Sequence, residues 1–92
     1  MADVIITLRI MPKSPEIDLN KLQKKAINEI KKFAGETETK NTIEPVAFGL
    51  KVLKITFVMD ENRGGTEELE NNISKLGGVN SVEVIDVRRA IG

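Results

Sequence analysis

The stretch that decides the fold is LKVLKITFVM, residues 50–59. Alternate positions place four apolar side chains on one face, which are Leu53, Ile55, Phe57 and Met59. This two-residue period is that of a β-strand. The opposite face carries Val52, Thr56 and Val58, so it is also largely apolar. We therefore expect residues 50–59 to form a strand inside a sheet rather than at its edge.

The stretch DVIITLRIM, residues 3–11, has the same period. One face carries Val4, Ile6, Leu8 and Ile10. Ile5 adds an apolar side chain to the other face, which indicates a second central strand. The two prolines of MPKSP, residues 11–15, end this strand because proline cannot donate a hydrogen bond to a ladder.

Residues 18–33 have the spacing of an amphipathic helix. Its apolar residues recur three and four positions apart and are Leu19, Leu22, Ala26, Ile30 and Phe33. We expect Asp18 to cap its start, with Ser14 followed by Pro15 as an alternative start. Gly35 ends the helix, since glycine adopts the left-handed conformation common at helix ends.

A second helix is expected over residues 66–76, with Thr66 as its cap. Its apolar residues Leu69, Ile73 and Leu76 share one side, and the glycine pair at 77–78 ends it.

Two further strands are expected, and both are less regular. Residues 37–44 are polar and rich in threonine, which is typical of an exposed edge strand. In residues 79–89, Val82 and Val84 share one face whereas Ile85 and Val87 share the other. Either a β-bulge or burial on both faces would explain this change, and the sequence leaves both open.

The predicted order is therefore β-α-β-β-α-β. Right-handed crossovers convert that order into an α+β fold, a ferredoxin-like four-stranded antiparallel sheet with two helices on one face. This arrangement places the first and third strands centrally, in agreement with their apolar character. The predicted core consists of Val4, Ile6, Leu8, Leu22, Ile30, Leu53, Ile55, Phe57, Leu69 and Ile73.

Composition limits the possible functions. We expect the 92 residues, 1–92, to form a single domain. Without cysteine or histidine, the chain has no thiol chemistry, no usual zinc site and no imidazole base. Fourteen basic and fourteen acidic residues balance, which disfavours nucleic-acid binding driven by bulk charge. No apolar run has the length of a membrane helix and no signal-peptide pattern is visible, so we expect a cytoplasmic protein.

No group of residues has the pattern of a catalytic, metal or cofactor site. The segment RGG at 63–65 lacks the lysine and spacing of a phosphate-binding loop. Five lysines on the first predicted helix fit a solvated face better than a binding patch. RNA-recognition modules of this fold stack bases on aromatic residues of the central strands, but Phe57 is assigned to the core here. We therefore expect a protein that binds a partner and does not make or break bonds, and so is not an enzyme.

Packing does not explain two segments, EPVAFGL at 44–50 and VIDVRRAIG at 84–92. A phenylalanine in a bend is more often tucked into the edge of a core than offered to a partner. Paired arginines near a terminus are usually solubilising. Each segment is therefore weak evidence when it is taken alone.

Taken together with their surroundings, these segments resemble a known family. The motifs are MPKSPEIDL at 11–19, EPVAFGLKVL at 44–53 and GGVNSVEVIDVRR at 77–89. They resemble the archaeal translation elongation factor 1-beta family, guanine nucleotide exchange factors for the GTPase elongation factor 1-alpha. The resemblance covers the whole chain, and it implies the ferredoxin-like fold that the strand pattern predicts independently.

The resemblance also implies a mechanism and its residues. In this family the C-terminal end is inserted near the magnesium and phosphate site of the GTPase, while loops grip another of its domains. The inserted lysine of eukaryotic relatives matches Arg89, and Arg88 takes this role if the strand register differs by one. The phenylalanine and glycine of the relatives' loop match Phe48 and Gly49. We expect Phe48 to be at least partly accessible in the free protein.

The expected partner is elongation factor 1-alpha in its GDP-bound and nucleotide-free states, with no nucleic acid, membrane or cofactor. The alternatives are an RNA-binding or ribosome-associated module of the same fold, and a regulatory domain that senses a small molecule.

Overall fold

The computed structural model describes residues 3–35 and 37–90. Over these residues the chain forms four strands, two α-helices and two short 3-10 helices. In chain order they are β1 (Asp3–Pro12), α1 (Leu19–Ala34), β2 (Thr39–Pro45), η1 (Ala47–Gly49), β3 (Lys51–Asp60), η2 (Glu61–Arg63), α2 (Glu67–Ser74) and β4 (Val79–Ala90).

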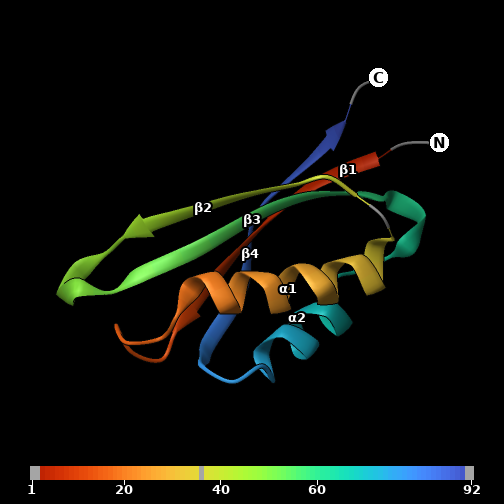
Figure 1. Cartoon of the computed structure of the whole chain (residues 1–92). Coiled ribbons are helices and arrows are strands. Elements are labelled where there is room, and N and C mark those ends of the chain that lie inside the picture. Colours follow the sequence, from red (N-terminus) through yellow and green to blue (C-terminus); the bar gives the residue numbers. More distant parts are fainter. Residues whose placement is uncertain (1–2, 36, 91–92) are drawn as a thin grey trace.

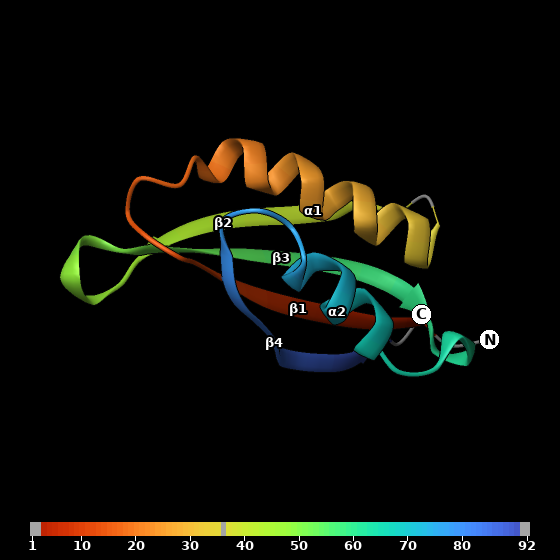
Figure 2. The same cartoon turned by 90° about the horizontal axis from the view of Figure 1, so that it is seen from below.

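The strands form an antiparallel sheet in the order β2-β3-β1-β4. Both α-helices cover the same face of this sheet (Figures 1 and 2). The predicted α+β ferredoxin-like fold is therefore confirmed, with β3 and β1 in the two central positions. Neither α-helix within the described ranges is long and apolar enough to cross a membrane.

The hydrophobic core lies between the sheet and the helices. Nine of the ten predicted core residues are buried, and Val4 is half-buried at the edge of the same cluster. Val4 lies near the start of β1, where its neighbour on β4 is Arg89 rather than an apolar residue. Phe57 is fully buried in this core, as predicted.

Helix α1 begins at the predicted cap. The Asp18 carboxylate accepts hydrogen bonds from the backbone N–H groups of Asn20 and Lys21, at 3.0 and 3.3 Å. These bonds satisfy donors that the first turn leaves free, so Asp18 and not Ser14 marks the helix start. The helix ends before Gly35, as predicted, but Gly35 has φ 82° and ψ −168° and is therefore not in the left-handed helical conformation.

Helix α2 is shorter than predicted and is not capped by the Thr66 side chain. The Thr66 hydroxyl donates instead to the carboxylate of Glu70, at 3.0 Å. At the other end, the N–H of Leu76 bonds to the carbonyl of Ile73, a tighter turn that ends the α-helix at Ser74. The predicted left-handed glycine past this helix is Gly78, with a φ of 91°.

Strand β2 begins two residues later than predicted, at Thr39. The reason is Thr37, whose hydroxyl lies 2.8 Å from the carbonyl oxygen of Val58 and 3.3 Å from its nitrogen. The Thr37 hydroxyl thus bonds to both backbone groups of Val58 in β3. The backbone hydrogen bonds between β2 and β3 therefore begin only at Thr39.

A β-bulge in β4 resolves the ambiguous pattern of the last strand. Leu8 pairs with Val84 and Thr7 pairs with Asp86, which leaves Ile85 as the extra residue. Of the two explanations that the sequence left open, the bulge is correct. Beyond it, residues with odd numbers lie on the helix-covered face, beginning with Val87 opposite Ile6.

The segment after β1 is held against the turn before β4. The N–H of Lys13 donates to the carbonyl of Gly78 at 2.8 Å. The positive φ of Gly78, 91°, favours glycine here, and a Cβ atom would also lie in tight contact with the side chain of Ile17, 3.0 Å from its Cδ1. The MPKSPEID segment is thus a fixed part of the fold.

One buried polar atom indicates a stabilising substitution. Asn41 lies opposite Ile55 on the helix-covered face, and its Oδ1 is buried without a hydrogen-bond partner among the described residues. We expect Asn41→Val to raise the free energy of unfolding by about 1–2 kcal/mol in urea denaturation, because an unsatisfied acceptor is removed. Thr42→Val, on the exposed face of the same strand, is the matched control and should change it by less than about 0.5 kcal/mol. Equal gains would instead assign the effect to strand propensity.

Candidate functional site

Phe48 lies at the tip of the β2–β3 hairpin, in the turn η1. Its side chain is 96% exposed, so the predicted accessibility is confirmed. The other two phenylalanines, Phe33 and Phe57, lie in or against the core. The chain therefore places one aromatic ring in solvent at the end of a hairpin, where large apolar side chains often mark a contact surface.

The turn holds Phe48 in a left-handed conformation, with φ 63° and ψ 29°. Gly49 follows with a φ of 74°, and the N–H of Leu50 bonds to the carbonyl of Ala47 at 3.4 Å. The N–H of Val46 bonds to the carbonyl of Leu50 at 2.8 Å, so three residues that include two with positive φ make the tip of the hairpin. Asparagine or glycine usually occupies the first of these positions, whereas a bulky residue there costs about 1–2 kcal/mol. Strain of this kind is concentrated at functional sites.

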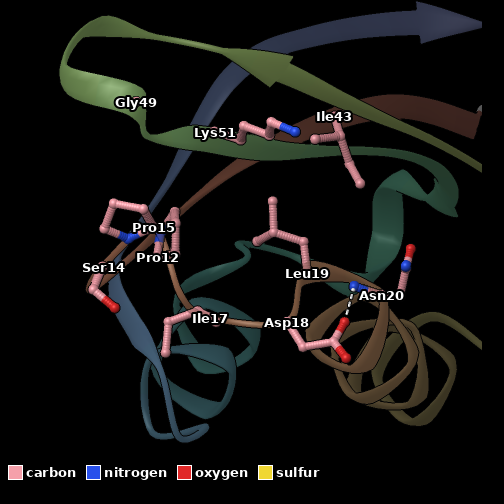
Figure 3. Close-up of a pocket in the computed structure, with 10 residues that line it drawn as sticks. All are labelled: Pro12, Ser14, Pro15, Ile17, Asp18, Leu19, Asn20, Ile43, Gly49 and Lys51. Atoms are coloured by element: carbon pink, nitrogen blue, oxygen red, sulfur yellow. Dashed lines mark hydrogen bonds between the residues drawn. The ribbon is translucent and has the colours of Figure 1, made fainter.

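Two further large apolar side chains of the same hairpin are partly exposed. Val46 and Ile43, on the same hairpin, are 38% and 39% exposed. Ile43 also lines a hollow of about 310 Å³ between the hairpin and the start of α1 (Figure 3). It is lined by Pro12, Ser14, Pro15, Ile17, Asp18, Leu19, Asn20, Ile43, Gly49 and Lys51.

This hollow brings together two motifs that are far apart in the sequence. Figure 3 shows Leu19 pointing from the start of α1 toward the hairpin strands that carry Ile43 and Lys51. Pro12, at the end of β1, and Pro15, in the segment after it, line the same hollow. The contribution of these prolines to this hollow was not predicted from the sequence, where they end a strand and belong to the MPKSPEIDL motif. Their close spacing beside a helix cap was the available signal.

Arg88 and Arg89 point to opposite faces of the sheet. Arg88 is opposite Ile5 and its Nε lies 2.9 Å from the carboxylate of Asp86, two residues away on the same strand. Arg89 is opposite Val4 on the helix-covered side, and its Nη2 lies 2.7 Å from Oε2 of Glu61 in η2. Both arginines are exposed, so each ion pair is weak and easily exchanged for another partner.

The structure does not bring Phe48 and Arg89 together. The η1 turn and the end of β4 lie at opposite ends of the molecule (Figures 1 and 2). The principal extents are 42 × 21 × 18 Å, so the separation runs along the long axis. The candidate residues therefore lie at two separate places on the molecule rather than in one pocket.

The open face of the sheet carries paired polar groups. The hydroxyls of Thr7 and Thr56 lie 3.0 Å apart, and Arg9 lies 3.2 Å from Glu83. Because Phe57 points into the core, this face offers no ring from the central strands for base stacking. The arrangement disfavours the RNA-binding alternative. Among the described residues, no group of three or more carboxylates is placed to hold a metal ion.

Comparisons with known proteins agree with the fold and with these motifs. Residues 5–90 match the family model of the EF-1 guanine nucleotide exchange domain. Elongation factor 1-beta of Methanothermobacter thermautotrophicus is 42% identical over 89 residues, which cover 97% of this chain and 98% of that protein. The protein of the same name from Methanosphaera stadtmanae is 44% identical with the same coverage. A de novo designed protein, Foldit4, aligns with a TM-score of 0.63 at 21% identity over 98% of both chains, a likeness of fold alone.

The conformation of Phe48 generates a prediction about stability. Asparagine tolerates the left-handed region, and the exposed ring of Phe48 buries little surface in the free protein. We expect Phe48→Asn to raise the free energy of unfolding by up to about 1 kcal/mol in urea denaturation. A loss of stability would mean that the ring supports the fold through packing.

Proposed function

The chain belongs to the EF-1 guanine nucleotide exchange domain family, and we propose that it promotes exchange of GDP for GTP on elongation factor 1-alpha. The observation that carries this conclusion is the match of residues 5–90 to that family. Relatives named elongation factor 1-beta, at 42–44% identity over nearly their whole length, support it. Residues 1–92 act as a single exchange domain in the cytoplasm.

In this proposal, Phe48 anchors the contact with the GTPase. A rigid, exposed aromatic ring binds with little loss of conformational entropy, and such rings are common hot spots of interfaces. The left-handed turn supports this role, because its strain has no packing benefit in the free protein. Gly49 contributes through its own positive φ, which lets the turn present the ring at the tip.

Arg89 acts at the other end of the molecule, at the magnesium and phosphate site of the GTPase. Magnesium neutralises phosphate charge and slows the release of GDP, so a factor that displaces it benefits from a positive charge nearby. Arg89 is exposed near the end of β4, which suits insertion into a cleft. Its planar guanidinium provides several donors for phosphate oxygens, although it is bulkier than a lysine ammonium.

The factor accelerates a dissociation and makes or breaks no covalent bond. It binds the GDP-bound GTPase and favours the nucleotide-free state. By linkage, GDP or GTP weakens its binding in return, which releases the factor after exchange. Neither nucleic acid nor a membrane is required as a partner.

The role of Phe48 can be tested by truncating the ring. We expect Phe48→Ala to weaken binding to nucleotide-free elongation factor 1-alpha by about 2 kcal/mol or more, with little loss of stability. Isothermal titration calorimetry measures the affinity and urea denaturation the stability. Val87→Ala, at an exposed apolar residue of β4, is the control and should bind normally. Normal binding by Phe48→Ala would contradict the anchor role.

The role of Arg89 can be tested by release of fluorescent GDP from the GTPase. We expect Arg89→Ala to slow release at saturating factor and physiological magnesium, while affinity changes less. Lowering magnesium should shrink the defect, because less metal has to be displaced. Arg88→Ala should release GDP normally, and Arg89→Lys should keep part of the rate because its charge is retained. Wild-type rates for all three variants would contradict insertion of the cation, whereas a defect in Arg88→Ala alone would move the role by one residue.

A further inference from the structure

We infer that Glu61 is a positioning residue for Arg89, holding its guanidinium at the end of the sheet in the orientation that enters the GTPase. This inference rests on the proposed role of Arg89. The observation behind it is the 2.7 Å hydrogen bond from Nη2 of Arg89 to Oε2 of Glu61, which joins residues 28 positions apart. At this distance the bond is short and charge-assisted.

The backbone that carries Glu61 is placed by the fold and not by Arg89. It belongs to η2, which directly follows Asp60 at the end of the central strand β3. The Asp60 carboxylate accepts the N–H of Asn62 at 2.9 Å, and the N–H of Gly64 bonds to the carbonyl of Glu61 at 3.4 Å. These local bonds define the turn, so the backbone of Glu61 is held within reach of the end of β4. The side chain of Glu61 is also the less exposed of the pair, 34% against 70% for Arg89.

Arg89 needs such a partner because packing does not restrain it. A long side chain that is 70% exposed keeps most of its rotamers and loses their entropy when it is fixed. A carboxylate that restrains it before binding removes part of that cost. The hydrogen bond to Glu61 uses one of the five N–H donors of the Arg89 guanidinium, so the other donors remain available for phosphate oxygens.

The β-bulge makes this contact specific to one arginine. Because Ile85 is the extra residue, Arg89 lies on the helix-covered side, the side on which it reaches Glu61. Arg88 lies on the open face and bonds to Asp86 on its own strand. Glu61 therefore distinguishes the two arginines, and the Asp86–Arg88 pair provides a matched control.

Two substitutions separate positioning from a competing effect of charge. If Glu61 merely neutralised Arg89, removing its charge would accelerate exchange. Glu61→Gln keeps the reach and an acceptor oxygen but removes the charge. Glu61→Asp keeps the charge but shortens the side chain by one methylene, so it no longer reaches Nη2. Positioning predicts a defect in Glu61→Asp, whereas competition predicts a gain in Glu61→Gln.

The experiment is release of fluorescent GDP from elongation factor 1-alpha at saturating factor. We expect Glu61→Asp to slow release roughly two- to fivefold, the range that the strength of an exposed ion pair allows. Glu61→Gln should keep most of the wild-type rate. Glu61→Asp combined with Arg89→Ala should be no slower than Arg89→Ala alone, because Glu61 acts through Arg89. Asp86→Asn should leave the rate unchanged.

A second measurement follows Arg89 in the free protein. Relaxation of the ¹⁵N nucleus of its Nε group should indicate greater mobility in Glu61→Asp than in the wild type, at equal melting temperature. A wild-type rate for Glu61→Asp while Arg89→Ala is slow would overturn the positioning role alone. Faster release by Glu61→Gln, or additive defects in the double variant, would also overturn it. A wild-type rate for Arg89→Ala would overturn the proposed role of Arg89 itself, and positioning with it.

Discussion

The covering of one sheet face by both helices is the constraint on which the rest of the structure depends. Leu8 and Phe57, from the two central strands, are buried completely against this layer. A chain that crosses twice over one face and pairs its strands antiparallel has to reverse direction at both ends of the sheet. The β2–β3 hairpin therefore lies at one end, and the start of β1 and the end of β4 lie at the other (Figure 1). The separation of Phe48 from Arg89 is a consequence of how the core is built.

In this sheet, one extra residue in β4 determines which of its side chains lie on each face. Val84 faces the core opposite Leu8, so a regular strand would place Arg88 on the helix-covered side. The bulge at Ile85 reverses the alternation and places Arg89 there instead. It also disturbs the regular edge of β4, which protects against edge-to-edge pairing with other chains. The same local irregularity thus determines which arginine lies on the helix-covered side and interrupts the exposed edge of the sheet.

The sequence predicted the features that depend on periodicity and local bonding. These include the central positions of β1 and β3, the cap at Asp18 and the burial of Phe57. It could not predict contacts between distant segments, such as the ion pair of Arg89 with Glu61 or the hollow between Pro12 and the hairpin. The capping bond of Thr66 was also missed, because a hydroxyl can bond to a side chain, here that of Glu70, as well as to the backbone. The left-handed conformation of Phe48 could not be predicted either, because phenylalanine rarely adopts a positive φ and glycine or asparagine is the usual residue in such a turn.

Strand β3 joins the two contact points directly. It begins at Lys51, two residues after the η1 turn, and ends at Asp60, immediately before Glu61. Ten residues of strand span roughly 33 Å. The strand is hydrogen-bonded to β2 on one side and to β1 on the other, so its length and direction are fixed by the sheet. A partner bound at Phe48 would therefore meet Glu61, and the guanidinium it holds, at a set distance and angle. The second contact then forms within the complex, at the high effective concentration that a rigid connection provides when the spacing of the two surfaces matches.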